Sequence, residues 1–178
     1  IILTNNSKVH AKYKFIFEIE FMEDRGYIDI LIEARDLIHK GYRLLTHPMS
    51  SSLKPNQTKF RSIMLQKTES GLDMESVLMI ERAVESAENF LKFKKIPDWD
   101  EKITDDFRTV EETIHRINSN LSDFNRSENK PYKLSFSLGH AVYHLSMGRT
   151  AESFFRAIDQ KMYAQKNSRK IEATVSQE

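Results

Sequence analysis

Cysteine is absent from this chain of 178 residues, which excludes disulfides, thiolate catalysis and cysteine metal sites. Such an absence is compatible with a reducing cytoplasm. The five glycines and four prolines are scattered along the chain, and no two glycines are adjacent. No glycine-rich phosphate loop is present, which argues against a nucleotide held in that way.

An excess of charge of one sign is also lacking, since 27 basic residues face 26 acidic ones. This balance gives no electrostatic reason to expect nucleic acid or a membrane surface as a partner. No apolar stretch is long enough to span a bilayer, and the short run at residues 1–4 lacks the basic flank of a signal peptide. We therefore predict a globular, cytoplasmic protein that binds neither nucleic acid nor membrane.

Short apolar or alternating runs predict five strands, at residues 1–3, 15–22, 42–46, 60–65 and 134–138. Apolar residues at helical spacing predict four helices, over residues 27–40, 74–92, 107–124 and 151–162. Gly26 opens the first helix, Gly41 suits the left-handed position after it, and Asp73 suits the N-cap of the second.

Strands that alternate with helices predict an α/β fold, with a small, mostly parallel sheet flanked by helices. The helix, strand and helix after residue 106 form a C-terminal appendage. We therefore divide the chain into a domain at residues 1–106 and a second part at residues 107–178. Because one strand cannot pair with itself, the second part should pack on the sheet edge of the first domain or on a second copy of the chain, which makes a homodimer a candidate assembly.

The loop at residues 47–58 is the candidate binding site. It follows a predicted strand, and α/β sheets commonly bind ligands beyond the carboxyl ends of their strands. Hydroxyl, amide, imidazole and ammonium groups there could hold a small anion or a carboxylate of a protein partner. The candidate residues are Asn5, Asn6, His47, Ser50, Ser51, Ser52, Lys54 and Asn56. The alternative is a surface loop that serves only as a turn.

Other polar residues carry weaker signals. The six histidines show no metal-binding spacing, so neither a metal site nor a cofactor is predicted. The acidic pairs at residues 105–106 and 111–112 each consist of neighbours that diverge on a helix, and we expect them to be solvated. No catalytic residue is therefore assigned.

Several segments in the first part of the chain resemble one family in order. They are residues 1–6, residues 34–48, residues 50–58 and the Pro-Asp-Trp motif at residues 97–99. Over about residues 1–110 they are similar to GrdX proteins, small proteins encoded near glycine, sarcosine or betaine reductase. The resemblance implies an accessory role and a protein partner in the glycine reductase system.

The remainder resembles a different family through residues 121–125, 131–141 and 157–166. These segments look like the C-terminal half of a GGDEF (diguanylate cyclase) domain. The signature glycine pair and the upstream metal-binding aspartate segment are missing, so no cyclase activity is expected. Lys166 and Lys170 match basic positions that contact nucleotide phosphate in that family, although an ordinary basic helix end explains them as well.

Three functions remain open at this point. The first is a non-catalytic accessory or binding protein linked to glycine reductase metabolism. The second is an enzyme that acts on a small anionic substrate in the loop at residues 47–58. The third is a degenerate nucleotide-signalling remnant carried by the C-terminal part.

Overall fold

The computed structural model describes residues 1–49, 53–69 and 71–127, with residues 134, 150, 153, 155–160, 162–163 and 167. Strands and helices alternate through the first half, and two long helices follow. The elements are β1 (Ile2–Thr4), α1 (Ser7–Tyr13), β2 (Ile19–Phe21), α2 (Tyr27–His39), β3 (Tyr42–Leu44), β4 (Ser62–Lys67), α3 (Met74–Phe93) and α4 (Glu101–Ser127).

A four-stranded sheet in the order β2-β1-β4-β3 forms the centre of the fold. The predicted α/β class is confirmed, but the expectation of a mostly parallel sheet is wrong. Only β1 and β2 pair in parallel, whereas β4 is antiparallel to both of its neighbours. The cause lies between β3 and β4: the described residues of that connection form no helix, and a parallel pair usually needs a helical crossover.

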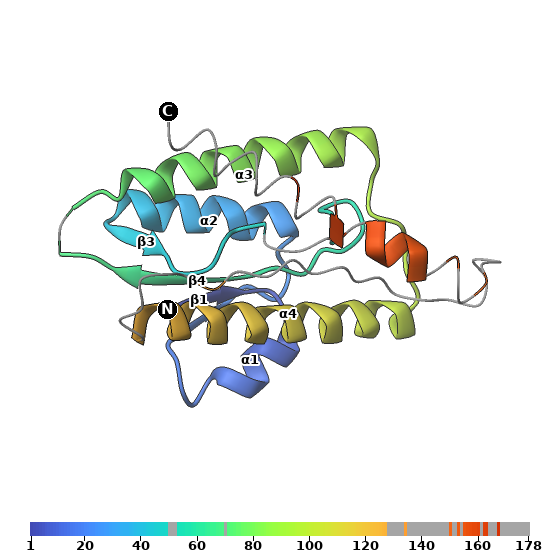
Figure 1. Cartoon of the computed structure of the whole chain (residues 1–178), viewed down its shortest axis with the longest axis horizontal. Helices are drawn as coiled ribbons and strands as arrows, with labels where there is room; N and C mark the ends of the chain where they lie inside the picture. The colour runs from blue at the N-terminus through green and yellow to red at the C-terminus, as the bar shows by residue number, and fades with distance from the viewer. Residues whose placement is uncertain are drawn as a thin grey trace.

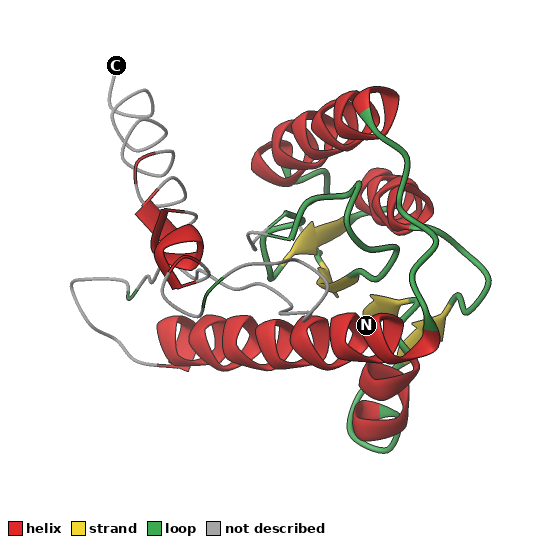
Figure 2. Cartoon of the chain, turned by 90° about the vertical axis from the view of Figure 1, so that its right-hand side faces the viewer, coloured by secondary structure: helices red, strands yellow, loops and turns green. Residues whose placement is uncertain are grey.

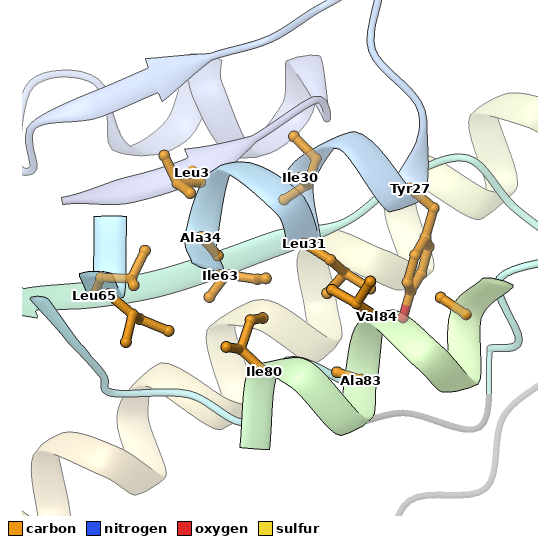
Figure 3. Packing of buried hydrophobic residues seen from close by; sticks show 12 residues of the cluster. Leu3, Tyr27, Ile30, Leu31, Ala34, Ile63, Leu65, Ile80, Ala83 and Val84 are labelled. Carbon is orange, nitrogen blue, oxygen red and sulfur yellow. The ribbon is translucent and has the colours of Figure 1, made fainter. Parts of the chain in front are cut away.

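Two helices cover each face of the sheet (Figure 1). On one face, α2 and α3 enclose an apolar cluster that the close view in Figure 3 shows, with Leu3 and Ile63 from the sheet, Leu31 from α2 and Ile80 from α3. On the other face α4 spans the strands and α1 packs beside it, as Figure 2 shows. The fold therefore has three layers, in which helices bury the sheet from both sides.

The ends of the helices follow the expected local chemistry. Gly26 is the N-cap of α2, where the Asp29 carboxylate accepts from its backbone N–H at 2.7 Å. Gly41 has a φ of 91° after the end of α2, and the Asp73 carboxylate accepts from Ser76 N at the start of α3. Asp100 caps α4 in the same way, so this helix begins six residues before the predicted position at residue 107.

The region before β2 departs from the sequence pattern. The half-buried strand predicted at residues 15–22 is wrong over its first part, because Phe15 is 88% exposed. A turn forms there instead, with the backbone N–H groups of Ile16 and Phe17 both donating to Tyr13 O. This turn ends α1, a helix that the sequence reading missed although its N-cap, Asn6, accepts from Lys8 N.

Few residues after Ser127 are described. Residues 155–160 are helical, and Thr150 Oγ1 accepts from Ser153 N, as expected at the start of the last predicted helix. Apart from Leu134, the strand predicted at residues 134–138 lies outside the described residues. Helix α4 runs without a break across residues 106 and 107, and a division of the chain at that place stays a prediction. Among the described helices, none has the length and apolar character needed to cross a membrane.

Candidate functional site

Three chain segments meet at one edge of the sheet, the edge where β1 and β3 end and β4 begins. Because β4 runs antiparallel to both β1 and β3, the carboxyl ends of β1 and β3 lie beside the start of β4. Asn5 follows β1, His47 lies just beyond β3, and Arg61 precedes β4. Arg61 contacts both of the others: its backbone N–H donates to Asn5 Oδ1 at 2.8 Å, and its Nη2 donates to His47 O at 2.9 Å.

The Arg61 side chain is only 3% exposed. Its guanidinium carbon lies 6.0 Å from the centre of the Tyr27 ring, at the start of α2. Its Nε is buried and has no hydrogen-bond partner. Among the residues that the structure describes, no carboxylate lies within ion-pair distance of this guanidinium. A buried cation therefore sits at this edge with most of its donors unused.

Glu111 of α4 is equally buried, on the other face of the sheet. Its Oε2 accepts from Asn6 Nδ2 at 2.8 Å and from Ser62 Oγ at 3.0 Å. Desolvation by burial raises the pKa of Glu111, although the nearby Arg61 charge and these two hydrogen bonds act in the opposite direction. The carboxyl group thus holds its proton more tightly than an exposed glutamate does.

The hydroxyl groups beside Glu111 form a directed chain. Thr4 Oγ1 accepts from Asn6 N at 3.0 Å and lies 2.7 Å from Ser62 Oγ. Since Ser62 donates its proton to Glu111, Thr4 must be the donor to Ser62. The chain ties the end of β1, the start of β4 and the middle of α4 together at one place.

His115, one turn after Glu111, is buried as well. Burial lowers its pKa from 6.5 to about 4, and the positive charge of Arg61 adds to the effect. Its Nε2 has no partner, and its ring stands edge-on to the Tyr13 ring of α1 at 5.7 Å. At neutral pH His115 is therefore uncharged and serves as packing between α1 and α4.

The asparagines predicted at the site are engaged within the protein. Asn5 Nδ2 donates to Arg25 O at 2.8 Å and to Lys59 O at 2.6 Å, which fixes the ends of two loops. Asn6 caps α1 and also donates to Arg108 O of α4 at 2.8 Å. Both side chains hold the edge in shape.

The predicted loop residues are placed in part. His47 is exposed and its Nδ1 accepts from Met49 N, while Asn56 is half-buried. Lys54 is exposed with its ammonium 5.3 Å from the centre of the Phe90 ring. Ser50, Ser51 and Ser52 lie outside the described residues, as do Lys166 and Lys170. A joint site of these residues with Asn5 and Asn6 stays a prediction.

Sequence reasoning missed the buried charged groups. The expectation that Glu111 is solvated is wrong, because it shares a helix face with Phe107, Ile114 and His115 that packs against the sheet. A charged residue within that apolar stripe was the available signal, as was Arg61 within the apolar run at residues 60–65. In the described part of the chain, no group of three His, Asp or Glu residues could hold a metal ion.

Comparison with models of protein families finds a match. A family model described as GrdX-like protein matches residues 1–121, which include Arg61, Glu111 and His115. No curated protein and no solved structure matches the chain. The region shared with this family thus contains the whole buried polar cluster at the sheet edge.

Proposed function

Because the chain belongs to the GrdX-like family, we propose that it is a non-catalytic accessory or binding protein in glycine, sarcosine or betaine reductase metabolism. In this role it binds a small anion, or a carboxylate of a partner in that system, at the edge of the sheet beside Arg61. The family supplies the metabolic context, and the sheet edge supplies the chemistry.

One observation carries the anion proposal: Arg61 is 3% exposed, and its guanidinium has no carboxylate within ion-pair distance among the described residues. A buried charge is costly unless it is paired and hydrogen-bonded. Arginine has five N–H donors in a planar fork that matches a carboxylate or phosphate. Within the described part of the chain, Nη2 donates to His47 O and the buried Nε has no partner. An anion at this place would satisfy the unused donors.

The loop at residues 47–58 would complete the site. His47 already touches Arg61 through its carbonyl oxygen. We propose that Ser50, Ser51, Ser52 and Asn56 donate further hydrogen bonds and that Lys54 adds positive charge near the entrance. Pro48 and Pro55 are buried and stiffen the loop, which reduces the entropy lost on binding.

Anion binding can be tested by calorimetric titration of the full chain with acetate, phosphate and glycine. We expect at least one of these probes to bind and to raise the melting temperature, since a ligand of the native state stabilises it. Arg61→Gln should weaken that binding by about tenfold to a hundredfold, the effect of losing a charge-assisted hydrogen bond.

Arg43→Gln is the matched control, since Arg43 is exposed on β3 and its Nη2 donates to Gln66 Oε1. It should leave the affinity unchanged. If wild-type protein binds none of the three probes at millimolar concentration, or if Arg61→Gln folds and binds as wild type does, the proposed site is wrong.

A second candidate is an enzyme that acts on a small anionic substrate at the same edge. The supporting observation is Glu111, a buried carboxyl group whose raised pKa suits proton transfer. Conversion of a bound probe, followed by NMR, would favour it over simple binding. The nucleotide-signalling alternative rests on residues largely outside the described ones, and we expect no product from GTP and magnesium.

A further inference from the structure

The two outer strands of the sheet, β3 and β2, differ in what covers their outer sides. At the β3 edge, Leu44 N donates to Ser76 Oγ of α3 at 2.8 Å, so a helix closes that edge. The other edge is formed by β2, which pairs with β1 alone in the sheet order β2-β1-β4-β3. Within the described chain, no strand or side-chain donor occupies the outer side of β2.

The backbone of β2 has groups ready to pair on that outer side. Toward β1, Glu18 O accepts from Ile2 N at 2.9 Å, and Met22 N donates to Thr4 O at 2.8 Å. Since backbone groups alternate in direction along a strand, the N–H and C=O groups of Ile19 and Phe21 point outward. They form a short template to which an extended chain can hydrogen-bond.

Apolar side chains continue this edge at its N-terminal end. Phe15 is 88% exposed, Ile16 is 69% exposed and Phe17 is also exposed, three consecutive residues in the turn before β2. Soluble proteins seldom leave such residues together in water without a binding role. The apolar turn and the unpaired strand are continuous along the chain and form one surface, the β2 edge (residues 15–21).

The two sides of this edge differ in charge. Ile19 packs on the α1 side and Phe21 stacks on the His10 ring of α1 at 4.4 Å. Glu20 alternates with these two residues and faces the α2 side, where the charges of Glu33 of α2 and of Glu18 act on it. Burial raises the pKa of Glu20, the repulsion from Glu33 and Glu18 adds to it, and Lys40 offsets part of it.

We propose that the β2 edge binds an extended segment of a partner protein, in which basic residues alternate with apolar ones, as an added fifth strand. Its basic side chains would lie on the α2 side, opposite the three glutamates. Its apolar side chains would lie on the α1 side, against Ile19, Phe21 and the exposed turn. Backbone hydrogen bonds to Ile19 and Phe21 give affinity, and the alternation gives specificity.

A second copy of this chain fits the edge poorly. In an antiparallel pairing of two β2 strands about Ile19, Glu18 of each strand would face Glu20 of the other. Like charges directly opposite each other destabilise a pair of strands. Charge complementarity therefore favours a basic partner over self-association.

The test uses the full chain and a fluorescent peptide with alternating Lys and Val residues, measured by anisotropy. A peptide of the same composition, with its lysines and valines in two blocks, is the control for unspecific attraction. We expect the alternating peptide to bind at least tenfold more tightly, and amide exchange at Ile19 and Phe21 to slow in the complex.

Variants on the surface separate docking from folding. Glu20→Lys should weaken peptide binding about tenfold or more, and Phe15→Ser should weaken it severalfold. Phe93→Ser is the matched control, because Phe93 is equally exposed but lies at the far end of α3; it should have no effect.

Three results would overturn the proposal. They are the absence of binding, equal binding of the block peptide, and a wild-type dimer that Phe15→Ser turns into monomers. None of them bears on the anion site, since the variants at Glu20 and Phe15 leave Arg61 and its contacts in place.

Discussion

The two faces of the sheet are built from the same strands but bury different groups beside β4. Along β4, Ile63 and Leu65 point toward α2 and α3 into an apolar cluster, whereas Ser62 points toward α4 and Glu111. The first face contributes to the free energy of unfolding through apolar burial, so removing side-chain volume there destabilises the protein. The second holds buried polar groups in place through hydrogen bonds, so its contribution depends on protonation. Apolar clusters that include Met64 of β4 and Phe107 of α4 add to the stability of the second face as well.

The largest effect is expected on the apolar face. Leu31 is fully buried at the centre of the cluster between the sheet, α2 and α3. Leu31→Ala should lower the free energy of unfolding by about 2–5 kcal/mol, from lost burial and the cavity left behind. Urea titration followed by circular dichroism measures this. A loss below about 1 kcal/mol would show that the two faces differ less than the packing indicates.

The next effect is a pH dependence on the polar face. Because burial lowers the pKa of His115 from 6.5 to about 4, the folded protein favours its neutral form. Its contribution is complete above pH 6.5 and is lost as the pH falls toward 4, by up to about 3 kcal/mol. His115→Gln should flatten the stability curve in this window, as measured by thermal melts at several pH values.

Glu111 changes the pH dependence of stability in the opposite direction to His115. Since burial raises its pKa, its contribution is largest at low pH and is lost as the pH rises through the folded-state pKa. Glu111→Gln therefore leaves the acid-side loss due to His115 in place. An unchanged acid limb in His115→Gln would contradict the assignment of that loss to His115.

A smaller effect is expected when the acceptor on α4 is removed. Glu111→Ala leaves Asn6 Nδ2 and Ser62 Oγ without their shared partner, which should cost about 1–3 kcal/mol. Glu111→Gln keeps an acceptor oxygen in a side chain of similar size and should retain most of the stability at neutral pH. Chemical denaturation of both variants gives the difference, and equal losses would show that the hydrogen bonds contribute little.

The smallest effect lies at the outer rim of the polar face. Lys12 of α1 and Glu112 of α4 form an ion pair that is partly exposed. Lys12→Ala should cost about 0–1 kcal/mol, and the cost should shrink in high salt because solvent screens such a pair. Melting curves at low and high salt test this. A salt-independent loss would indicate that the alkyl chain of Lys12 matters more than its charge.

Local chemistry made helices α2 and α3 predictable from the sequence. Asp73 at a cap, Gly41 in the left-handed region and the apolar stripe of α2 each act within a few residues, and all three are confirmed. Strand direction was not predictable in this way. Alternation shows that a strand has a buried face, but it does not show which strand lies beside it, and so the antiparallel position of β4 was missed.

The candidate site was also only partly predictable, because local sequence patterns do not show contacts between distant segments. Asn5 and His47 were expected to share one edge of the sheet, and the structure brings both into contact with Arg61. The connection through Arg61 joins segments 14 and 56 residues apart, which no local pattern contains. The sequence analysis predicted a solvated Glu111 because acidic residues are mostly exposed, but this position lies on the buried face of α4. Its partners, Asn6 and Ser62, are distant in sequence.

The inner position of β1 has a consequence for how the chain is made. Residues 2–4 leave the ribosome well before their antiparallel partners, residues 62–64, which come some sixty residues later. At about 5–20 residues per second, β1 waits on the order of 3–12 s before β4 can pair with it. Until then its neighbours in the described chain are β2, α1 and α2, and only two strands of the sheet can pair. Completion of the sheet thus waits for β4, and closure of the polar face waits longer still, for α4.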